Sequence, residues 1–429
     1  MSLRFCMITT FYPPHNFGGD GMGIQRLSEA LARRGHHVTV IHDTDAYDML
    51  SPRPAPAPDP TPEGMTIHRL DNRLGSFSNL LTQQLGRPVV NGRRIRQIVD
   101  EGDFDVVNFH NISLVGGPGV LRVGGGVKLF MAHEHWLVCP THVLWRHGRE
   151  RCDKRECVRC VLRHGRPPQL WRYTGLLERE LRHVDAFIAM SDFSRKKHAE
   201  FGFPREMDVV PYFLPDVGPV PDTSNGARRD AGATPAEESP HPRPYFLFVG
   251  RLEKIKGLDD VIPIFREERR ADLLIAGDGE YASTLRSLAE GLPNVHFLGR
   301  IHPDALGRYY RHARALVVPS VCYETFGIIL IEAFRQGVPV IARRLGPFPE
   351  IVELAGAGEL FESPEELEVA MEAFLSDDDH RRRLGEAGRR AFAEHWSESA
   401  VIPRYLDVVA RVAKTRGMTS LLKKLEGTA

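Results

Sequence analysis

The chain has 429 residues, of which 42% are hydrophobic and 26% charged, and its 56 basic and 56 acidic side chains give a formal net charge of zero. This length exceeds one ordinary core, so we expect two domains. The charge balance argues against a nucleic-acid partner, and no apolar run is long enough to span a membrane. The N-terminus, MSLRFCMITTFYPP, meets its prolines too soon for a signal peptide, which favours a cytoplasmic location.

Residues 1–215 alternate short apolar runs with helical patterns. LRFCMITT is followed by the loop FYPPHNFGGDGMG, the helical stretch IQRLSEALARRG and a second apolar run, HHVTVIHD. This order is typical of a β–loop–α–β unit, and further strands are expected at DVVNFHN, VKLFMAH, DAFIAMS and MDVVPYF. The pattern predicts a Rossmann-like N-terminal domain, interrupted by a proline-rich loop at Ser51–Gly64 and a cysteine-bearing insertion at about 136–166.

The alternation stops at 216–243, which is rich in Pro, Gly and charge and is interpreted as a linker or flexible loop. It restarts at 244–398 with PYFLFVG, ADLLIAG, NVHFLG, RALVVPS and VPVIAR. Continuous apolar runs of this kind indicate parallel strands that are buried on both faces. We therefore predict a second α/β domain there, followed by a helical segment at 399–429.

The stretch YETFGIILIEAF places Glu332 in an apolar run, eight residues after Glu324. A buried carboxylate is costly unless it has a partner. We expect a helix from about Phe326–Gly327, with Thr325 near its N-cap and Glu332 about two turns along it. The first-turn amides, near Gly327 and Ile328, would then form an anion site between two carboxylates. A sugar–diphosphate–ribose ligand has this layout; the alternative is one buried Glu paired to an Arg.

Two glycine-bounded loops follow the first two strands of the second domain. FVGRLEKIKG carries two cations, Arg251 and Lys256, and IAGDGE carries Asp278 between two glycines. Ligands of open α/β sheets bind at the carboxyl ends of strands, so these loops suit a diphosphate. The alternative is a pair of solvated surface cations.

These motifs together carry a family resemblance. The GRL-x3-KG loop, the GDG turn and the Glu-x7-Glu segment ETFGIILIE resemble the donor half of retaining GT-B glycosyltransferases of family four, the glycosyl transferases group 1. The resemblance covers most of the chain. It implies an α/β GT-B fold, in which two Rossmann-like, doubly wound parallel-sheet domains face each other across a cleft. The N-terminal domain would bind the acceptor, and the C-terminal domain a nucleotide-sugar donor, UDP- or GDP-linked. The helical segment at 399–429 would cross back to the N-terminal domain, as it usually does in this fold.

The resemblance also implies roles for individual residues. Arg251 and Lys256 would hold the diphosphate and stabilise its charge as it leaves, without a catalytic metal. Glu324 would contact hydroxyls of the donor sugar, and Glu332 those of the ribose. The other donor-binding residues would be Gly18, Gly19, Gly250, Gly277, Asp278, Phe326, Gly327 and Ile328. Pro347, in LGPFPEIV, departs from the usual double glycine and has no amide proton to offer.

In the first domain, Gly18 and Gly19 lie on the loop NFGGDGMG, which is not a G-x-G-x-x-G fingerprint and so argues against a nicotinamide enzyme. MAHEHW supplies His133 and Glu134, which match the family's His–acid pair near the reacting sugar; a structural histidine is the alternative. The resemblance implies retention through front-face attack by the acceptor hydroxyl. The D-x-D of HDTDAYD, Asp43 and Asp45, is interpreted as solvated loop acids rather than a metal site.

Four of the six cysteines form the pattern Cys139-x12-Cys152-x4-Cys157-x2-Cys160. Clustered cysteines in a cytosolic protein more often bind metal than form disulfides. Four thiolates suit a structural zinc ion, with an iron–sulfur cluster or unpaired thiols as alternatives, and His142 or His147 could replace one cysteine. The hypothesis is a metal that pins an insertion beside the acceptor cleft.

Two other function classes remain open on sequence alone. A glycoside phosphorylase or sugar-phosphate synthase would share the fold, and a non-catalytic nucleotide- or carbohydrate-binding protein would keep only the binding site. The acceptor could be a small molecule, a glycan or a lipid-linked glycan. The basic and apolar segment Leu80–Val99 could lie on an anionic membrane at its inner face or form an ordinary amphipathic helix. The sequence does not specify an oligomeric state.

Overall fold

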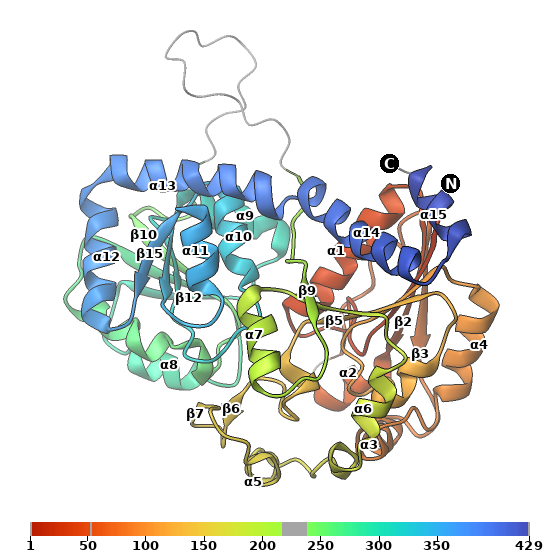
Figure 1. Ribbon diagram of the computed structural model, residues 1–429. Helices are drawn as coiled ribbons and strands as arrows, with labels where there is room; N and C mark the ends of the chain where they lie inside the picture. Colours follow the sequence, from red (N-terminus) through yellow and green to blue (C-terminus); the bar gives the residue numbers. More distant parts are fainter. Residues whose placement is uncertain (1, 52–53, 217–237, 428–429) are drawn as a thin grey trace. The chain divides into compact units, whose positions relative to one another are not determined.

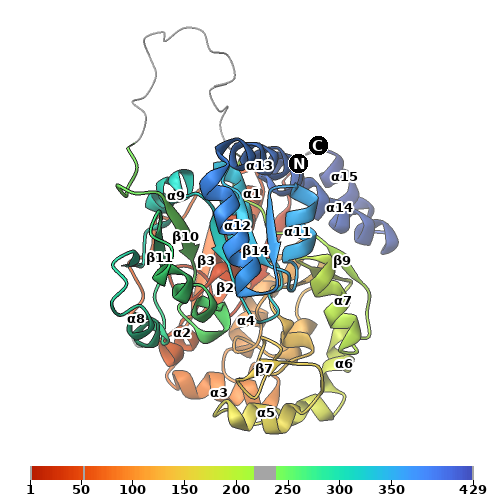
Figure 2. The same ribbon diagram turned by 90° about the vertical axis from the view of Figure 1, so that its left-hand side faces the viewer.

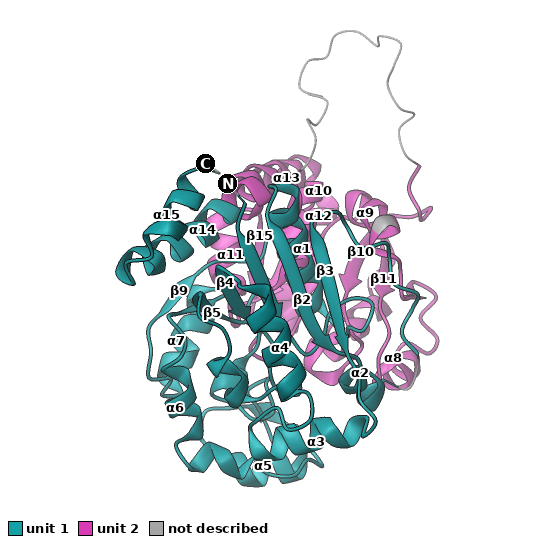
Figure 3. Cartoon of the chain, turned by 90° about the vertical axis from the view of Figure 1, so that its right-hand side faces the viewer, with its two compact units in different colours: residues 1–213, 324–326, 401–429 teal, residues 214–323, 327–400 magenta. Residues whose placement is uncertain are grey.

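The computed structural model describes residues 2–51, 54–216 and 238–427 (Figure 1). The chain divides into two compact units (Figure 3). Unit 1 contains Met1–Phe213, Glu324–Phe326 and Val401–Ala429, and unit 2 contains Leu214–Tyr323 and Gly327–Ala400. Most of the predicted linker at 216–243 lies outside the described residues.

Unit 1 is built on a seven-stranded sheet in the order β3-β2-β1-β4-β5-β8-β9, and every neighbouring pair is parallel. Its strands are β1 Arg4–Ile8, β2 His37–Asp43, β3 Met65–Leu70, β4 Val106–Phe109, β5 Val127–Ala132, β8 Ala186–Ala189 and β9 Met207–Val209. All residues of β4, β5 and β8 are buried, as expected of strands covered on both faces.

The helices of unit 1 connect these strands or belong to the cysteine-bearing insertion. They are α1 Gly19–Arg33, α2 Thr44–Leu50, α3 Ser76–Leu85, α4 Gly92–Gly102, α5 Cys157–Arg163, α6 Leu176–Leu181 and α7 Asp192–Glu200, with 3-10 turns η1 Pro118–Arg122, η2 His135–Leu137 and η3 Leu170–Tyr173. The insertion also holds a two-stranded antiparallel hairpin, β6 Trp145–Arg146 and β7 Glu150–Arg151.

Unit 2 is built on a six-stranded parallel sheet in the order β12-β11-β10-β13-β14-β15. Its strands are β10 Tyr245–Val249, β11 Asp272–Ala276, β12 Val295–Gly299, β13 Leu316–Val318, β14 Val340–Arg343 and β15 Gly358–Phe361. Its helices are α8 Ala282–Leu288, α9 Pro303–His312, α10 Ile328–Gln336, α11 Phe348–Ala355, α12 Pro364–Ser376 and α13 Asp378–Ala391, with short turns η4 Lys254–Lys256, η5 Leu258–Asp260, η6 Ile262–Arg266 and η7 Phe392–Trp396. Helices α11 and α12 pack against β14 and β15 (Figure 2).

Both sheets share one topology, because each runs outward from its first strand and then reverses. The reversal falls between β1 and β4 in unit 1 and between β10 and β13 in unit 2. Ligands of doubly wound sheets bind at such a reversal, outside the carboxyl ends of the strands. The prediction of two Rossmann-like, doubly wound parallel sheets is therefore confirmed.

The C-terminal helices α14 Glu398–Thr415 and α15 Thr419–Glu426 return the chain to unit 1 from Val401 onward. Arg416 pairs with Asp185 at 2.9 Å, and Lys424 with Asp105 at 2.7 Å. Both aspartates lie just before or at the amino end of a strand of the unit 1 sheet. The ion pairs thus fasten the two helices to that edge.

The acids of the D-x-D motif are not solvated loop residues, so that prediction is wrong. Asp43 is the last residue of β2, is 1% exposed, and caps α2 by accepting a hydrogen bond from the Ala46 amide at 3.0 Å. Its other oxygen accepts from Asn79 and Asn91 at 2.9 and 3.2 Å. Burial raises the pKa of Asp43 to about 6, against these donors. Asp43 is buried because it is both the last residue of a buried strand and the N-cap of the helix that follows.

Leu80–Val99 is also not one helix. It is shared between α3 and α4, with the break at 86–91, where Gly86 takes a left-handed conformation that ends α3. Among the described residues, no helix has both the length and the apolar character that crossing a membrane requires.

Candidate active site

The loops that follow β10, β11 and β13 touch one another through glycines in unit 2. A Cβ atom on Gly277 would lie 1.8 Å from the Gly250 carbonyl oxygen, and one on Gly257 would lie 2.1 Å from that of Pro319. Gly257 also has a φ of 73°, in the left-handed region that favours glycine. The close approach of these loop backbones therefore requires glycine at both positions.

The two predicted cations lie on the loop after β10. Arg251 is 53% exposed, and its guanidinium lies 2.6 Å from the Glu253 carboxylate. Lys256 ends the short turn η4, directly before Gly257. An anionic ligand at this loop would compete with Glu253 for Arg251. Breaking the Arg251–Glu253 ion pair costs little free energy, because exposed ion pairs contribute only about 0–1 kcal/mol.

The amino end of α10 is the third part of this edge. Its N-cap is Gly327, which has a φ of 129° and no side chain to cap the first-turn amides. A Cβ there would lie 2.7 Å from Leu330 and 2.8 Å from Phe348, so no larger residue fits. Amides at an uncapped helix start, with the helix dipole, bind anions.

The predicted start of this helix is early by one or two residues. Thr325 is not the cap, because its hydroxyl donates to the His133 carbonyl at 2.7 Å. Glu332 is the fifth residue of α10, about 6 Å along the axis rather than two turns. Its Oε2 accepts a hydrogen bond at 2.9 Å from Tyr310 of α9, the helix packed beside α10. Sequence reasoning missed Tyr310.

In unit 1, His133 follows β5 and belongs to a chain of buried polar groups. Its Nε2 lies 2.8 Å from His110 Nδ1, and its Nδ1 lies 2.5 Å from the Tyr212 hydroxyl. Burial lowers the pKa of His133 to about 3 and that of His110 well below its ordinary value, so both rings are neutral. Each neutral imidazole offers one donor and one acceptor.

The contact of His110 with Met7 determines which group donates in each hydrogen bond of this network. His110 Nε2 lies 3.5 Å from the sulfur of Met7, which can only accept, so His110 carries its proton there. His133 then donates from Nε2 to His110, and Tyr212 donates to His133 Nδ1. Both ring nitrogens of His133 are engaged within unit 1, so a bond from this ring to a donor hydroxyl stays a prediction that requires Tyr212 to move. Tyr212 and His110 were not predicted.

The segment Glu324–Phe326 groups with unit 1, and Glu332 with unit 2, so the Glu-x7-Glu motif spans the boundary of the units. The Ser191 hydroxyl donates to the Thr325 carbonyl at 2.6 Å and also caps α7. The Phe326 ring lies 5.7 Å from that of Tyr212. These contacts hold Glu324, which is half-buried, next to the strand-end residues of unit 1.

Gly18 and Gly19 form the start of α1, with Gly18 as an extended N-cap that lacks a side chain. The Asn16 side chain donates to the Gly18 carbonyl at 2.6 Å, which fixes the loop before the helix. Further along α1, a Cβ on Gly23 would lie 2.3 Å from the Tyr212 ring. The start of α1 and the His110–His133–Tyr212 chain therefore lie at the same edge of the unit 1 sheet.

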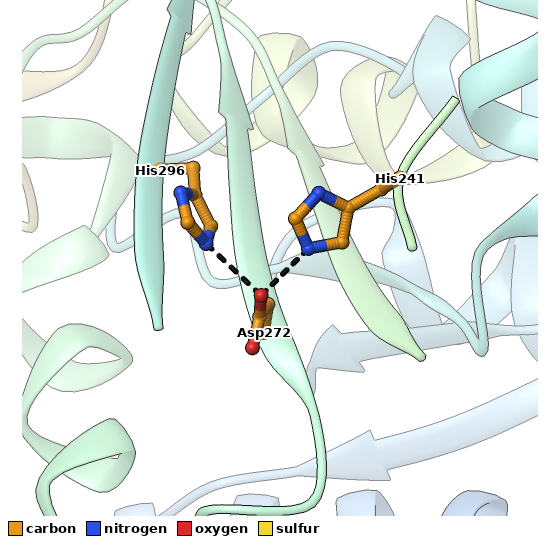
Figure 4. Close-up of side chains that lie close together, drawn as sticks. All are labelled: His241, Asp272 and His296. Carbon is orange, nitrogen blue, oxygen red and sulfur yellow. Dashed lines mark hydrogen bonds and ion pairs between the residues drawn. The ribbon is translucent and has the colours of Figure 1, made fainter. Parts of the chain in front are cut away.

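The four clustered cysteines line one cavity and are all free thiols. Cys139 and Cys160 are buried, and Cys152 and Cys157 are half-buried. Within the described residues, however, one group alone brings three possible ligand atoms within 4.8 Å of one another, and it lies in unit 2: His241, Asp272 and His296 (Figure 4). The cysteine sulfurs are more widely spaced than a closed zinc cage.

The comparisons with known proteins concern the family and the fold. The family model for Glycosyltransferase Family 4 matches residues 17–214, and that for Glycosyl transferases group 1 matches residues 233–391. The D-inositol 3-phosphate glycosyltransferase of Segniliparus rotundus is 32% identical over 389 residues, which cover 86% of this chain and 80% of the relative.

Two solved structures share the fold at low sequence identity. Sucrose-phosphate synthase from Thermosynechococcus elongatus has a TM-score of 0.70 and 18% identity, over 96% of this chain and 100% of the other. Anabaena HepE in complex with UDP has a TM-score of 0.63 and 14% identity, over the same shares of the two chains. The two doubly wound sheets thus define a GT-B glycosyltransferase fold. The chain belongs to glycosyltransferase family four, the glycosyl transferases group 1.

Replacing Tyr212 with Phe tests the buried chain. The change removes the donor to His133 Nδ1 and leaves a buried acceptor unsatisfied, so we expect the free energy of unfolding to fall by about 1–3 kcal/mol in chemical denaturation. Tyr173→Phe is the matched control, because Tyr173 is 64% exposed and its hydroxyl can bond to water. Equal stability of the two variants would contradict the hydrogen-bond chain.

Proposed function

We propose that this glycosyltransferase moves a sugar from a nucleoside-diphosphate donor to an acceptor hydroxyl, with retention of anomeric configuration and without a catalytic metal. The observation that carries the proposal is the uncapped start of α10 beside the Arg251–Gly257 loop, at the strand reversal of unit 2. Amides and cations on one edge suit a diphosphate. The UDP in the HepE complex supports a nucleotide ligand for this fold.

Different residues of unit 2 would bind the diphosphate and the ribose of the donor. Arg251 and Lys256 neutralise the diphosphate as its charge grows on departure, together with the amides near Gly327 and Ile328. Glu332 accepts from the ribose hydroxyls, and Tyr310, which donates to its Oε2, holds the carboxylate in orientation. The Gly277–Asp278 turn lines the same edge, where Asp278 is exposed.

The reacting sugar would be bound by residues that group with unit 1. Glu324 would accept hydrogen bonds from sugar hydroxyls, and Gly18 and Gly19 would approach the phosphates with backbone amides. The departing diphosphate takes the proton of the attacking acceptor hydroxyl, so no side chain has to act as a covalent nucleophile. A phosphorylase or a synthase acting on a sugar phosphate is the second candidate, and the Thermosynechococcus sucrose-phosphate synthase shares the fold.

Nucleotide binding is the first test. We expect UDP, GDP, ADP or dTDP to raise the melting temperature, because a ligand at a hundred times its dissociation constant stabilises the folded state by about 2.7 kcal/mol. Arg251→Ala and Glu332→Ala should abolish the shift, while Glu290→Ala, an exposed glutamate of unit 2, should keep it. The active nucleotide sugar should then give a product whose anomeric configuration matches the donor by NMR.

No shift with any nucleotide would refute the donor site. A shift without transfer to any hydroxyl acceptor, but with transfer to or from inorganic phosphate, would instead favour the phosphorylase. A shift with no turnover at all would favour a binding protein.

The cysteine-bearing insertion supports a second proposal, a structural zinc ion held by Cys139, Cys152, Cys157 and Cys160. His142, Leu144 and His147 have φ of 75°, 47° and 53°, three of the four non-glycine residues with positive φ in the described chain. Such a backbone is strained and persists only when its surroundings hold it. A hairpin of two-residue strands and a seven-residue helix supply little hydrophobic core. A bound metal would stabilise the insertion in place of such a core.

One cation near the insertion would offset part of the charge of a thiolate cluster. Arg172 stacks on Trp136 and Trp171 at 5.1 and 4.7 Å and interacts electrostatically with Cys139 and Cys157. The His147 amide donates to Cys160 Sγ at 3.2 Å. A zinc ion with four thiolates carries a net charge of −2, of which the guanidinium would offset half. The sulfurs have to move closer than they are here for Zn–S distances of about 2.3 Å.

Cobalt substitution tests the thiolate site. We expect protein loaded with Co²⁺ to show a sulfur-to-metal charge-transfer absorption that disappears in Cys152→Ser with Cys157→Ser, while Cys322→Ala keeps it. Purified protein that contains neither zinc nor iron by elemental analysis, and gives no such absorption, would remove the proposal. Iron with visible absorption as isolated would replace zinc with an iron–sulfur cluster.

Exposed apolar residues of unit 1 support a lipid surface as the site of the acceptor. Of thirteen large hydrophobic residues exposed in the described chain, nine lie at 74–89 and 158–173: Leu74, Phe77, Leu80, Leu85, Val89, Val158, Leu162, Leu170 and Tyr173. Trp171 Nε1 donates to the Gln83 carbonyl at 2.7 Å and thus ties η3 to α3. Exposed arginines accompany both stretches: Arg87, Arg93, Arg94, Arg96, Arg159, Arg163 and Arg166. Apolar and basic side chains together bind anionic membranes.

Vesicle flotation tests this surface. We expect the protein to float with anionic phosphatidylglycerol vesicles and not with neutral phosphatidylcholine vesicles. Phe77→Ser with Leu170→Ser should greatly reduce flotation, because these side chains are 56% and 67% exposed. Val369→Ser is the control, since Val369 is 71% exposed in unit 2. Equal flotation of all three proteins, or none with anionic lipid, would retire the membrane surface.

A further inference from the structure

A third feature of the chain lies at the amino end of the unit 2 sheet and has no part in the donor site. Asp272 is the first residue of β11, and His296 is the second residue of β12, its neighbour. His241 lies shortly before β10, the neighbour on the other side. Three residues that are 31 and 24 positions apart are thus brought together by strand order alone.

The three side chains point at one another (Figure 4). Asp272 Oδ2 lies 2.6 Å from His241 Nε2 and 3.0 Å from His296 Nε2. The other oxygen, Oδ1, forms an ion pair with Arg243 Nη1 at 3.0 Å. Both imidazole nitrogens therefore point at this one oxygen, and Arg243 pairs with the other oxygen, as outer partners of metal ligands do.

We propose that His241, Asp272 and His296 bind a divalent transition-metal ion of the zinc class. Two imidazoles and a carboxylate are a donor set of such ions, and a water completes the tetrahedron. Asp272 is 3% exposed, but the His296 side chain is 36% exposed, so an ion and its water can enter from that side. Ligand atoms of tetrahedral zinc lie about 3.3 Å apart, so the cluster has to open by less than about 1 Å.

The alternative is that the cluster holds no metal and its three side chains are joined by hydrogen bonds. Two neutral imidazoles can each donate an Nε2–H to Asp272 Oδ2, which satisfies the carboxylate without a metal. When the ion binds through the two Nε2 atoms, each imidazole carries its proton on Nδ1 instead and stays neutral. Arg243 opposes an added cation, but its side chain is 46% exposed, so solvent screens that repulsion.

The ion would have a structural role. It would fasten the segment 238–241, where the described chain resumes in unit 2, to strand β11 and the edge strand β12. Asp272 and Ala276 are the two ends of β11, so the site lies about 13 Å along the strand from the loops at the carboxyl edge. It is independent of the glycosyl transfer proposed above, and nucleotide binding should not require it.

Zinc binding to the full-length chain, freed of metal with a chelator, tests the proposal. We expect calorimetric titration with Zn²⁺ alone to show a site that His241→Gln and His296→Gln each weaken more than about 100-fold. The melting temperature should rise with zinc in wild type and not in these variants. His380→Gln is the matched control, because His380 pairs with one carboxylate, Glu359 at 3.2 Å, and has no second histidine.

The same titration with Co²⁺ separates this site from the cysteines. A site of nitrogen and oxygen ligands gives no sulfur-to-metal charge transfer, so the equivalent lost in His296→Gln should leave that absorption unchanged. If wild type, His241→Gln and His296→Gln bind the same number of zinc ions with the same affinity, the proposal is wrong. Two histidine variants are used because one of them could fail to fold, and circular dichroism shows whether each is folded.

Discussion

The close approach of loops at the reversal of each parallel sheet is the constraint on which the candidate site depends. Crossovers on opposite sides of a doubly wound sheet leave the carboxyl ends of the two strands at the reversal open to a ligand. In unit 2, the loops from these strands come so close that Gly257 has no room for a side chain beside Pro319. The same compression places Arg251, Lys256 and the start of α10 on one edge.

Unit 1 uses the corresponding edge differently. There the strand ends carry His110, His133 and Tyr212, and their hydrogen bonds run in one direction toward the sulfur of Met7. A buried polar network of this kind is stable only when every member has a partner, and it then specifies one arrangement. The backbone of His133 also accepts from Thr325, so the rigidity of the network extends to the residue beside Glu324.

Much of the fold could be predicted because parallel strands buried on both faces leave continuous apolar runs in the sequence. The glycine loops could be predicted because close backbone approach restricts the residue type. Tyr212 and Tyr310 could not, since their partners lie 79 and 22 positions away and nothing local in the sequence marks the contact. Asp43 was misjudged because its neighbours Asn79 and Asn91 arrive from later segments. The start of α10 was misjudged because the unusual backbone of Gly327 delays the helix.

The neutrality of the buried imidazoles has a consequence for the protein in acid. An unfolded histidine takes up a proton near pH 6.5, whereas burial holds the pKa of His133 and His42 at about 3 and that of His198 at about 4. Between these limits each of these histidines binds more protons in the unfolded chain than in the native one, so their contribution to native stability is complete above about pH 6.5 and falls as the pH decreases. The burial that keeps these three imidazoles neutral therefore makes unit 1 sensitive to acid.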